Sequence, residues 1–503
     1  MVFDKSTAHL PLEKKLYQLI IGRLDGDRIS VPQYKESAFL HVRNGIGGFI
    51  LFGGKSDEVR HFAAELQAVA EYPLLIASDV ERGVGQQIEG GTIFSCQMAV
   101  AAATDRSKPE DVALLDRALQ AVARECAFIG INMPLIPVLD VNQNPENPII
   151  STRAFSDDPE VVTWFGVRYI ETLEKAGLVS CAKHFPGHGD TTVDSHLSLP
   201  IIGKALDELI TTDIMPFTAA VRHGVSSIMV GHLSVPAIDS LPATLSPKIH
   251  ELLRGTLGFD GLIVTDALTM KALDDVPDAA VRCLNAGADI LLHPADPGET
   301  VEGLLSAVVS GRLSEGRVDE AVNRVLKRKE TLWHALRDEI DFPAHAALSS
   351  QIADRSVCLI KGTLGAGPVA KAEDITVFVA GEGDAADVSL FRSLSPRVSK
   401  LPEQHTIRDL RNATTVIMIF TSIAAWKGHP GLGGDEQSRI RGIISGSRKS
   451  VVISFGNPYV LRHFPESDVL LAAFDASAQT QRAVVRWLSG QGALYGKMPL
   501  TLS

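Results

Sequence analysis

The sequence predicts an α/β protein in which an N-terminal (β/α)8-type TIM barrel is followed by a smaller C-terminal α/β domain, an open sheet sandwiched between helices. Two observations predict this fold. Short apolar runs alternate with longer amphipathic segments as far as about Leu336, and a similar alternation begins again near Ser349. The chain also has 503 residues, more than one compact core usually organises.

Leucine and isoleucine side chains recur at helical spacing between Leu12 and Leu24, which predicts an opening amphipathic helix that ends near Gly26. The expected barrel strands are runs of consecutive apolar residues, as strands covered on both faces should be. Helical patterns lie between them, for example over residues 161–176 and 206–221. The expected strands span residues 47–52, 73–78, 129–139, 178–182, 226–230, 261–264 and 288–292.

Ionisable side chains stand where these apolar runs end. In a parallel barrel the carboxyl ends of all strands lie on one face, and catalytic groups collect there. A single polar strand end carries little information, but several in succession predict a site. The strand ends are Asp79, Asp140, Lys183, His184, His232, Asp266 and His293.

A helical pattern that ends near Leu336 closes the expected barrel, and the charged and small residues after it predict a linker. The predicted limits are residues 1–336 for the barrel domain, 337–349 for the linker and 350–503 for the second domain. Gly-rich loops in the second domain fit neither the dinucleotide-binding nor the phosphate-loop spacing. Its expected strands span residues 375–380, 415–420, 451–455 and 469–474, and an expected helix spans 479–488.

Composition narrows the classes of partner. The net charge is -12 and no basic stripe offsets it, so nucleic acid is not expected as a partner. The five cysteines are scattered among apolar residues, which favours buried free thiols over disulfides or a metal site. No apolar run reaches transmembrane length, and the N-terminus lacks the apolar core of a signal peptide. A cytoplasmic protein without a membrane partner is therefore expected.

The stretch LVSCAKHFPGHGDTTVDSHLSLP, residues 178–200, carries the densest group of titratable side chains. An apolar run leads into a loop punctuated by Gly and Pro, and this loop predicts a functional site. A metal site is one alternative, because histidines and carboxylates are common ligands. However, no early strand shows the His-x-His pattern of barrel metallohydrolases, so no metal is assigned. The titratable residues of the loop are His184, His188, Asp190, Asp194 and His196.

Within this stretch, KHFPGHGDTTVDSHLSLP (residues 183–200) resembles the signature of glycoside hydrolase family 3, in its β-N-acetylglucosaminidase branch. Four further motifs follow the order of that family: ASDVERGVGQ (77–86), PVLDVNQNPENPIISTRAF (137–155), MVGHLSVP (229–236) and GFDGLIVTDALTM (258–270). The resemblance covers the first domain densely. The second domain resembles the C-terminal α/β domain of the family more loosely.

The resemblance implies that Asp266 is the nucleophile of a retaining glycosidase, in which the proton donor lies only about 5–5.5 Å from the attacking carboxylate. It also implies that His196 is the proton donor. Asp194 could hold one ring nitrogen of His196 and fix its tautomer, so that the histidine protonates the leaving oxygen and later takes a proton from water. The two residues would thus act as a dyad.

The resemblance further implies that Asp79, Arg153, Lys183 and His184 bind the sugar, because charged groups suit its hydroxyl and acetamido groups. His188 and Asp190 are expected to support the loop. The sequence departs from the family pattern after Asp79: Arg82 replaces a glycine and Gln87 replaces an arginine that contacts substrate. No cofactor is implied.

The leading interpretation is a retaining exo-β-N-acetylglucosaminidase that hydrolyses terminal β-linked GlcNAc from peptidoglycan-derived muropeptides or chitooligosaccharides. One alternative is a β-glucosidase or β-xylosidase whose acid/base is a glutamate of the second domain, with Glu382 and Glu436 as candidates. Another is a β-GlcNAc phosphorylase, because a neutral histidine would not repel phosphate as a carboxylate would. A protein that binds sugar without turnover is the last alternative.

Overall fold

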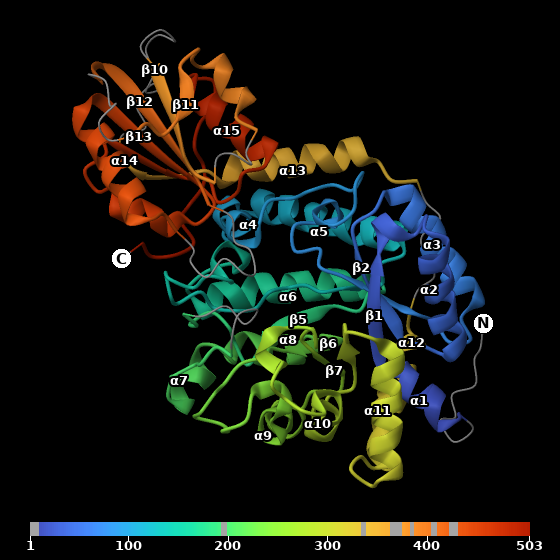
Figure 1. The fold of residues 1–503 in the computed structure, drawn as a ribbon. Coiled ribbons are helices and arrows are strands. Elements are labelled where there is room, and N and C mark those ends of the chain that lie inside the picture. Colours follow the sequence, from blue (N-terminus) through green and yellow to red (C-terminus); the bar gives the residue numbers. More distant parts are fainter. Residues whose placement is uncertain are drawn as a thin grey trace. The chain divides into compact units, whose positions relative to one another are not determined.

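The computed structural model describes residues 10–192, 199–332, 339–362, 375–382, 387–403, 410–421 and 431–502. The chain forms two compact units, each of which is described by itself. The first unit comprises Met1–Ile93, Ala118–Val141 and Val162–Phe342, and the second comprises Phe94–Arg117, Asn142–Val161 and Pro343–Ser503. Figure 1 colours the chain by sequence position.

Among its described residues, the first unit contains eight parallel strands. Their hydrogen-bonded order is β4-β3-β2-β1-β8 in one sheet and β5-β6-β7 in another. Parallel bridges from Val138 to Lys183 and from Val264 to Ile290 join the two sheets and close the ring. The predicted barrel is therefore confirmed. The strands are β1 (Ile20–Asp25), β2 (Gly48–Phe52), β3 (Leu75–Ser78), β4 (Met133–Pro134), β5 (Cys181–Phe185), β6 (Ser227–Val230), β7 (Leu262–Thr265) and β8 (Leu291–Leu292).

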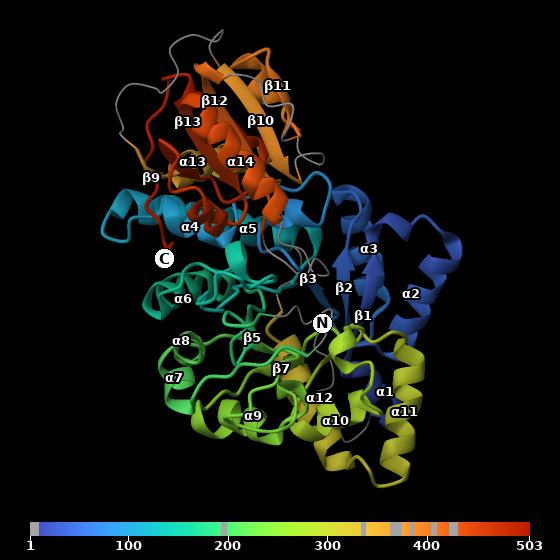
Figure 2. The same ribbon diagram turned by 60° about the vertical axis from the view of Figure 1, so that its left-hand side comes forward.

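Helices cover the outside of the ring; α2 and α3, for example, lie beside β1 and β2 in both ribbon views (Figures 1 and 2). Every residue of β3, β5, β6 and β7 is buried, which explains why β3, β6 and β7 are mainly apolar without alternation. The helices of this unit include α1 (Leu12–Gln18), α2 (Pro32–Asn44), α3 (Ser56–Val69), α6 (Pro159–Lys175), α7 (Leu206–Thr211), α8 (Met215–Arg222), α9 (Pro247–Glu251), α10 (Ala279–Ala286), α11 (Pro297–Val309) and α12 (Glu315–Lys329).

The prediction of one helix from Leu12 to Leu24 is wrong. Helix α1 ends at Gln18, and the rest of the predicted helix is β1, the first barrel strand. Ile20 and Ile21 pair with Leu291 and Leu292 of β8. The apolar side chains here fit helical spacing and a buried strand equally well, and only pairing with distant strands decides between the two.

Two other expected elements differ in extent. The expected strand 129–139 is mostly irregular: α5 (Pro109–Ile129) ends where it should begin, and β4 has only two residues. The expected helix 206–221 is divided into α7 and α8, and Pro216 stands in the first turn of α8, where a proline costs no hydrogen bond.

In the part of the second unit that the structure describes, six strands form a sheet in the order β11-β10-β12-β13-β14-β9, parallel except for the edge strand β9 (Figure 2). Successive residues of β12 point to opposite faces: Ile417 belongs to one apolar cluster and Val416 to the other. Helices α4 (Gln97–Ala103) and α14 (Gly434–Gly446) supply the first cluster, and α15 (Ala478–Leu488) supplies the second. The predicted open sheet between helices is confirmed. Its strands are β9 (Cys358–Lys361), β10 (Ile375–Gly381), β11 (Val398–Lys400), β12 (Leu410–Phe420), β13 (Ser447–Phe455) and β14 (Val469–Ala472).

Helix α13 (Phe342–Ser356) begins inside the segment 337–349, where a linker was expected. Pro343 suggested a loop, but it lies in the first turn of α13, where proline is tolerated. The stretch 94–117, which follows β3 in the sequence, belongs to the second unit. The domain limits 1–336 and 350–503 stay a prediction.

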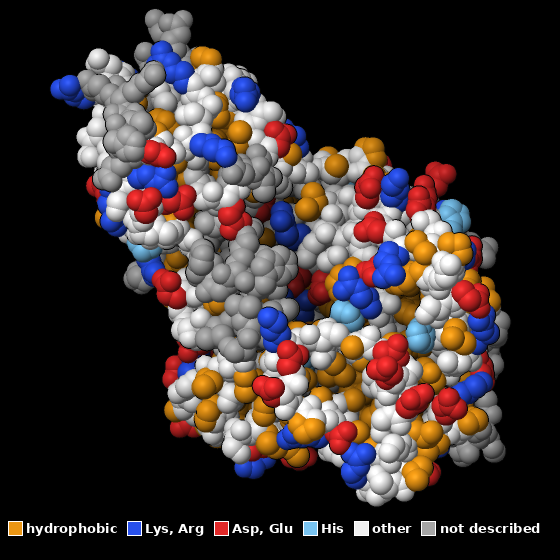
Figure 3. All heavy atoms as spheres, in the orientation of Figure 1, with side chains coloured by type: hydrophobic (Ala, Val, Ile, Leu, Met, Phe, Trp, Pro, Cys, Tyr) orange, Lys and Arg blue, Asp and Glu red, His pale blue; other side chains and the backbone are white. Residues whose placement is uncertain are grey.

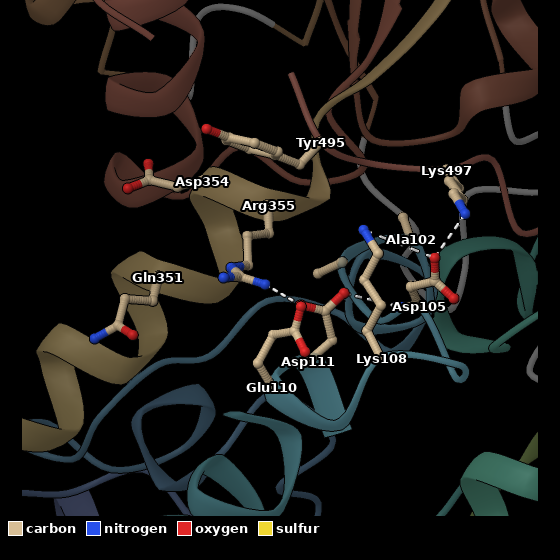
Figure 4. Close-up of a pocket in the computed structure, with 11 residues that line it drawn as sticks. Ala102, Asp105, Lys108, Glu110, Asp111, Gln351, Asp354, Arg355, Tyr495 and Lys497 are labelled. Atoms are coloured by element: carbon tan, nitrogen blue, oxygen red, sulfur yellow. Dashed lines mark hydrogen bonds and ion pairs between the residues drawn. The ribbon is translucent and has the colours of Figure 1, made fainter. Parts of the chain in front are cut away.

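Ion pairs, in addition to the apolar side chains of α4, join residues 94–117 to the rest of the second unit. Arg355 of α13 pairs with Asp111 at the start of α5, and Lys497 Nζ lies 2.7 Å from Asp105 Oδ2 (Figure 4). Together with Tyr495, these residues line a cavity of about 450 Å³. Sequence patterns do not reveal such pairs, because each joins segments far apart in the chain.

All five cysteines are buried free thiols, as predicted. Within the described ranges, no helix is long and apolar enough to cross a membrane. On the face drawn in Figure 3, acidic and basic side chains are interspersed.

Lys329, at the end of α12, is buried and donates to Gln18 Oε1 at 2.7 Å. Burial lowers the pKa of Lys329 to about 7, whereas the ordinary value is 10.5. Between these two values the unfolded chain binds one more proton than the folded chain at this site, so the free energy of unfolding rises with pH by at most about 1.4 kcal/mol per pH unit. Below pH 7 the lysine is charged in both states and the slope vanishes.

We therefore expect the wild type to gain about 2 kcal/mol of stability between pH 7 and pH 9 relative to Lys329→Met. Urea unfolding of both proteins at the two pH values measures this difference, and groups that titrate in both proteins cancel. A stability difference that does not change with pH would contradict the prediction.

Candidate active site

The carboxyl ends of the barrel strands bring the predicted residues to one face. Because all eight strands are parallel, side chains that end or follow them lie at the same end of the barrel. Asp79 follows β3, Lys183 and His184 belong to β5, and Asp266 follows β7. These residues carry the candidate site.

Lys183 is the central cation of this face. Its Nζ lies 2.6 Å from Asp79 Oδ1 and 2.8 Å from Glu81 Oε1. The lysine side chain is 2% exposed and that of Asp79 is 31% exposed. A buried cation needs such paired carboxylates to offset the loss of hydration. The pairing fixes Asp79 at the rim and leaves part of its carboxylate accessible to a ligand.

His184 is held by a buried carboxylate. Its Nδ1 lies 2.7 Å from Asp140 Oδ2, while Asp140 Oδ1 accepts the backbone N–H groups of His184 and His188. Burial alone would raise the pKa of Asp140, but the two histidines and their hydrogen bonds bring it below its usual value. Because the carboxylate accepts at Nδ1, this ring nitrogen of His184 carries a proton. His188 Nδ1 is paired with Thr191 Oγ1 at 2.8 Å within its own loop.

Asp266 stands at the end of β7 in a fixed backbone. Its N–H donates to Val230 of β6 at 3.1 Å, and the N–H of Ala267 donates to its Oδ1 at 2.8 Å. The charges of Asp79, Lys183 and Asp266 all act on the thiol of Cys181. The pKa of that thiol is raised to about 11, chiefly by burial; the two carboxylates also raise it, whereas the hydrogen bond with Ser227 and the charge of Lys183 lower it.

Further groups on this face include Asp25 and Glu81, which were not singled out from the sequence, and His293, which was expected as a strand end. Asp25 ends β1, and Arg23 of the same strand lies over the ring of Phe52 at 4.8 Å. Burial lowers the pKa of His293 and the charge of Arg23 adds to this effect, whereas Asp25 and Asp79 oppose it. Asp25 was missed because its strand fits a helical pattern. Glu81 lies in a quoted motif, and its spacing of two residues from Asp79 was the available signal.

Arg153 belongs to the second unit, at the end of a single 3-10 turn, Ser151–Arg153. Its Nη1 donates to the carbonyl of Ile149 at 3.1 Å, and its own carbonyl accepts from Gln97 Nε2 at 2.7 Å. These contacts hold Arg153 against its own segment and α4. Its role in substrate binding stays a prediction.

The predicted dyad, Asp194 and His196, lies outside the described residues. The chain on both sides of it is anchored to the barrel. Before it, His188 is tied to Asp140; after it, Lys204 Nζ lies 2.7 Å from the buried Asp213 Oδ2. The proton donor assigned from the sequence therefore stays a prediction.

The described residues bear on two of the alternatives, the metal site and the glutamate acid/base of the second domain. In the described portion of the chain, no three His, Cys, Asp or Glu side chains are grouped closely enough to hold a metal ion. Glu436 Oε1 accepts the N–H of Gly381 at 3.0 Å. The N–H of Glu382 donates to the carbonyl of Phe420. Both candidate glutamates thus stand near the ends of strands of the second sheet.

Comparison with known proteins agrees with this geometry. The sequence model described as "Glycosyl hydrolase family 3 N terminal domain" matches residues 11–328. A β-N-acetylglucosaminidase/β-glucosidase of Cellulomonas fimi is 27% identical over 519 residues, which cover 90% of this chain and 88% of that protein.

Two solved structures match nearly the whole chain. The glycoside hydrolase family 3 β-N-acetylglucosaminidase of Paenibacillus sp. str. FPU-7 has a TM-score of 0.84 and 29% identity, over 98% of this chain and 99% of that one. The β-glucoside phosphorylase BglX bound to 2FGlc has a TM-score of 0.85 and 25% identity, over 98% of this chain and 95% of that one. Since the family match spans more than half of the sequence and the strand-end residues of the barrel agree with it, the chain belongs to glycosyl hydrolase family 3.

Proposed function

We propose that this enzyme is a retaining exo-β-N-acetylglucosaminidase that removes terminal β-linked GlcNAc from peptidoglycan-derived muropeptides or chitooligosaccharides. The observation that carries the proposal is the carboxylate of Asp266, fixed by the N–H of Ala267 at the same end of the barrel as the Lys183–Asp79 pair. The names of the relatives support the choice of sugar. Recycling of peptidoglycan fragments in the cytoplasm is the cellular role that we propose.

The reaction has two displacements. In the first, Asp266 attacks the anomeric carbon while the bond to the leaving oxygen breaks, and His196 gives that oxygen its proton. In the second, His196, now neutral, takes a proton from water. The resulting hydroxide oxygen displaces Asp266 from the sugar. Asp194 would hold the His196 ring in one tautomer and stabilise its charged form.

Three of the described residues, Asp79, His184 and Arg153, would hold the sugar. Asp79 can accept hydrogen bonds from sugar hydroxyls, because its carboxylate remains partly exposed beside Lys183. The ring of His184 can form another hydrogen bond at Nε2. Since Lys183 and Asp140 fix these two side chains, they need little reorganisation when substrate binds. Arg153 completes the set on the basis of its motif.

Phosphorolysis is a second candidate, favoured by the similarity to a β-glucoside phosphorylase. The first displacement would be unchanged. In the second, phosphate would attack the glycosyl-enzyme in place of water and give a sugar 1-phosphate. A histidine acid/base allows this, because it places no negative charge near the incoming anion.

A panel of aryl β-glycosides of GlcNAc, glucose and xylose, assayed with and without phosphate, tests both functions. We expect the GlcNAc substrate to be cleaved fastest and to release free GlcNAc at a rate that phosphate does not change. Formation of sugar 1-phosphate would identify a phosphorylase. A faster reaction with the glucoside would favour the β-glucosidase alternative and direct attention to Glu382 and Glu436.

A further inference from the structure

We propose that His232 is a positioning residue for Asp266: it fixes the peptide that follows the nucleophile and so holds the carboxylate in its attacking orientation. His232 follows β6 and is fully buried. Its Nε2 lies 3.1 Å from the carbonyl oxygen of Ala267, and its Nδ1 lies 2.6 Å from Thr244 Oγ1. This inference rests on the proposed role of Asp266.

The partner of Nε2 shows which ring nitrogen of His232 acts as the donor to Ala267. A carbonyl oxygen can only accept, so the hydrogen bond to Ala267 requires a proton on Nε2. The Thr244 hydroxyl lies 2.6 Å from Nδ1, and it is held in turn by donating to the carbonyl of Gly231 at 3.1 Å. Thr244 thus keeps the donor nitrogen of His232 directed at Ala267, in the way that a second partner commonly orients a functional histidine.

The peptide between Ala267 and Leu268 is held at both of its polar groups. His232 binds its carbonyl oxygen, and its N–H donates to the carbonyl of Leu292 in β8 at 2.9 Å. One residue earlier, the N–H of Asp266 is bound to Val230 of β6. The backbone dihedrals of Ala267 are therefore fixed from two neighbouring strands.

This arrangement matters because Ala267 supplies the N–H that donates to Asp266 Oδ1 at 2.8 Å. Without His232, the carbonyl of Ala267 would keep the N–H of Met270 as a donor, at 3.1 Å, but would lose the side chain that holds it from the β6 side, and the turn could rotate. Such a rotation would move the Ala267 N–H away from the carboxylate. A misplacement of about 1 Å at a reacting group can lower the rate by about 100-fold.

Three variants test the inference. His232→Leu removes the donor, whereas His232→Gln retains an amide N–H near the place of Nε2. Thr244→Val keeps the imidazole but removes the hydroxyl that orients its ring, and it serves if His232→Leu does not fold. His250→Leu is the matched control: His250 is also a buried histidine of the first unit, and its Nδ1 lies 2.9 Å from the carbonyl of Ser246.

The measurements are kcat and KM on an aryl β-N-acetylglucosaminide, the inhibition constant of free GlcNAc, and the rate at which a 5-fluoro glycosyl fluoride of GlcNAc labels Asp266. We expect His232→Leu to slow labelling by about 100-fold while GlcNAc binds with an affinity within about threefold of wild type. His232→Gln keeps a donor to Ala267, so its labelling rate should stay within about fivefold of the wild-type rate. Thr244→Val only loosens that donor, so its labelling should be slowed by about three- to tenfold.

The inference is overturned if His232→Gln is as slow as His232→Leu, if both label at the wild-type rate, or if His250→Leu is slowed equally. Labelling of wild-type Asp266 combined with any of these results overturns the inference and leaves the proposed function standing. A wild-type enzyme that turns over substrate but is never labelled at Asp266 overturns the proposed nucleophile, and with it the role of His232.

Discussion

Asp266→Asn is expected to lower kcat on an aryl β-N-acetylglucosaminide by about 10⁴-fold or more, because an amide cannot form the glycosyl-enzyme on which both displacements depend. The substitution keeps the size of the side chain and an oxygen that can accept from Ala267. Folding and sugar binding should therefore change little. Steady-state kinetics of the purified variant, with the inhibition constant of GlcNAc measured in parallel, tests this expectation.

The matched control is an aspartate that flanks the same strand. Asp260 precedes β7 at its opposite end, its side chain is 83% exposed, and it pairs with Lys327 at 3.1 Å. An exposed ion pair contributes about 0–1 kcal/mol to stability, so Asp260→Asn should leave kcat unchanged. A fluorinated glycosyl donor should give an adduct on the peptide that contains Asp266 in the wild type and in Asp260→Asn. An adduct on Glu382 or Glu436 instead would contradict the assignment.

The barrel and the strand-end residues were predictable because they depend on local patterns. Buried parallel strands leave a run of apolar residues, and a strand that ends in a functional group leaves an ionisable residue directly after that run. Asp79, Lys183, His184 and Asp266 all carry this signal, and the structure places them at one end of the barrel. The family motifs then add roles that spacing alone does not supply.

What the sequence did not reveal depends on tertiary contacts. The strand Ile20–Asp25 is defined by its pairing with β2 and β8, which lie far from it in the sequence. The pairing of Glu81 with Lys183 is equally remote. Residues 142–161 follow a barrel strand, yet they belong to the second unit, where Asn142 Nδ2 donates to the hydroxyl of the buried Tyr459 at 3.2 Å.

This last observation bears on the proposed substrate contact. Arg153 lies in a segment that the second unit holds, since Glu146 pairs with Arg462 and the hydroxyl of Ser156 donates to the carbonyl of Pro499. From its position in the sequence, after the barrel strand β4, Arg153 would be expected to belong to the first unit. The second unit therefore shapes the segment that carries one of the proposed binding residues.

His196→Ala should impair the enzyme in proportion to how much the leaving group needs a proton. With a sugar or alkyl alcohol as leaving group we expect kcat/KM to fall by about 10²–10⁴-fold, the usual contribution of a general acid. With a dinitrophenyl leaving group, which departs without protonation, kcat/KM should fall by less than about tenfold. A series of aryl β-N-acetylglucosaminides of increasing leaving-group pKa should therefore give a steeper dependence of rate on that pKa for the variant than for the wild type.

Two further measurements separate this role from a loss of folding. Azide, which needs no general base, should restore turnover of the dinitrophenyl substrate by His196→Ala and give the β-glycosyl azide, because attack on the glycosyl-enzyme inverts a second time. His223→Ala is the control, since His223 is a half-exposed histidine paired with Glu171 on the helical surface. An equal loss of rate on every leaving group, or no loss on any, would show that His196 is not the proton donor and that the acid/base must come from another residue.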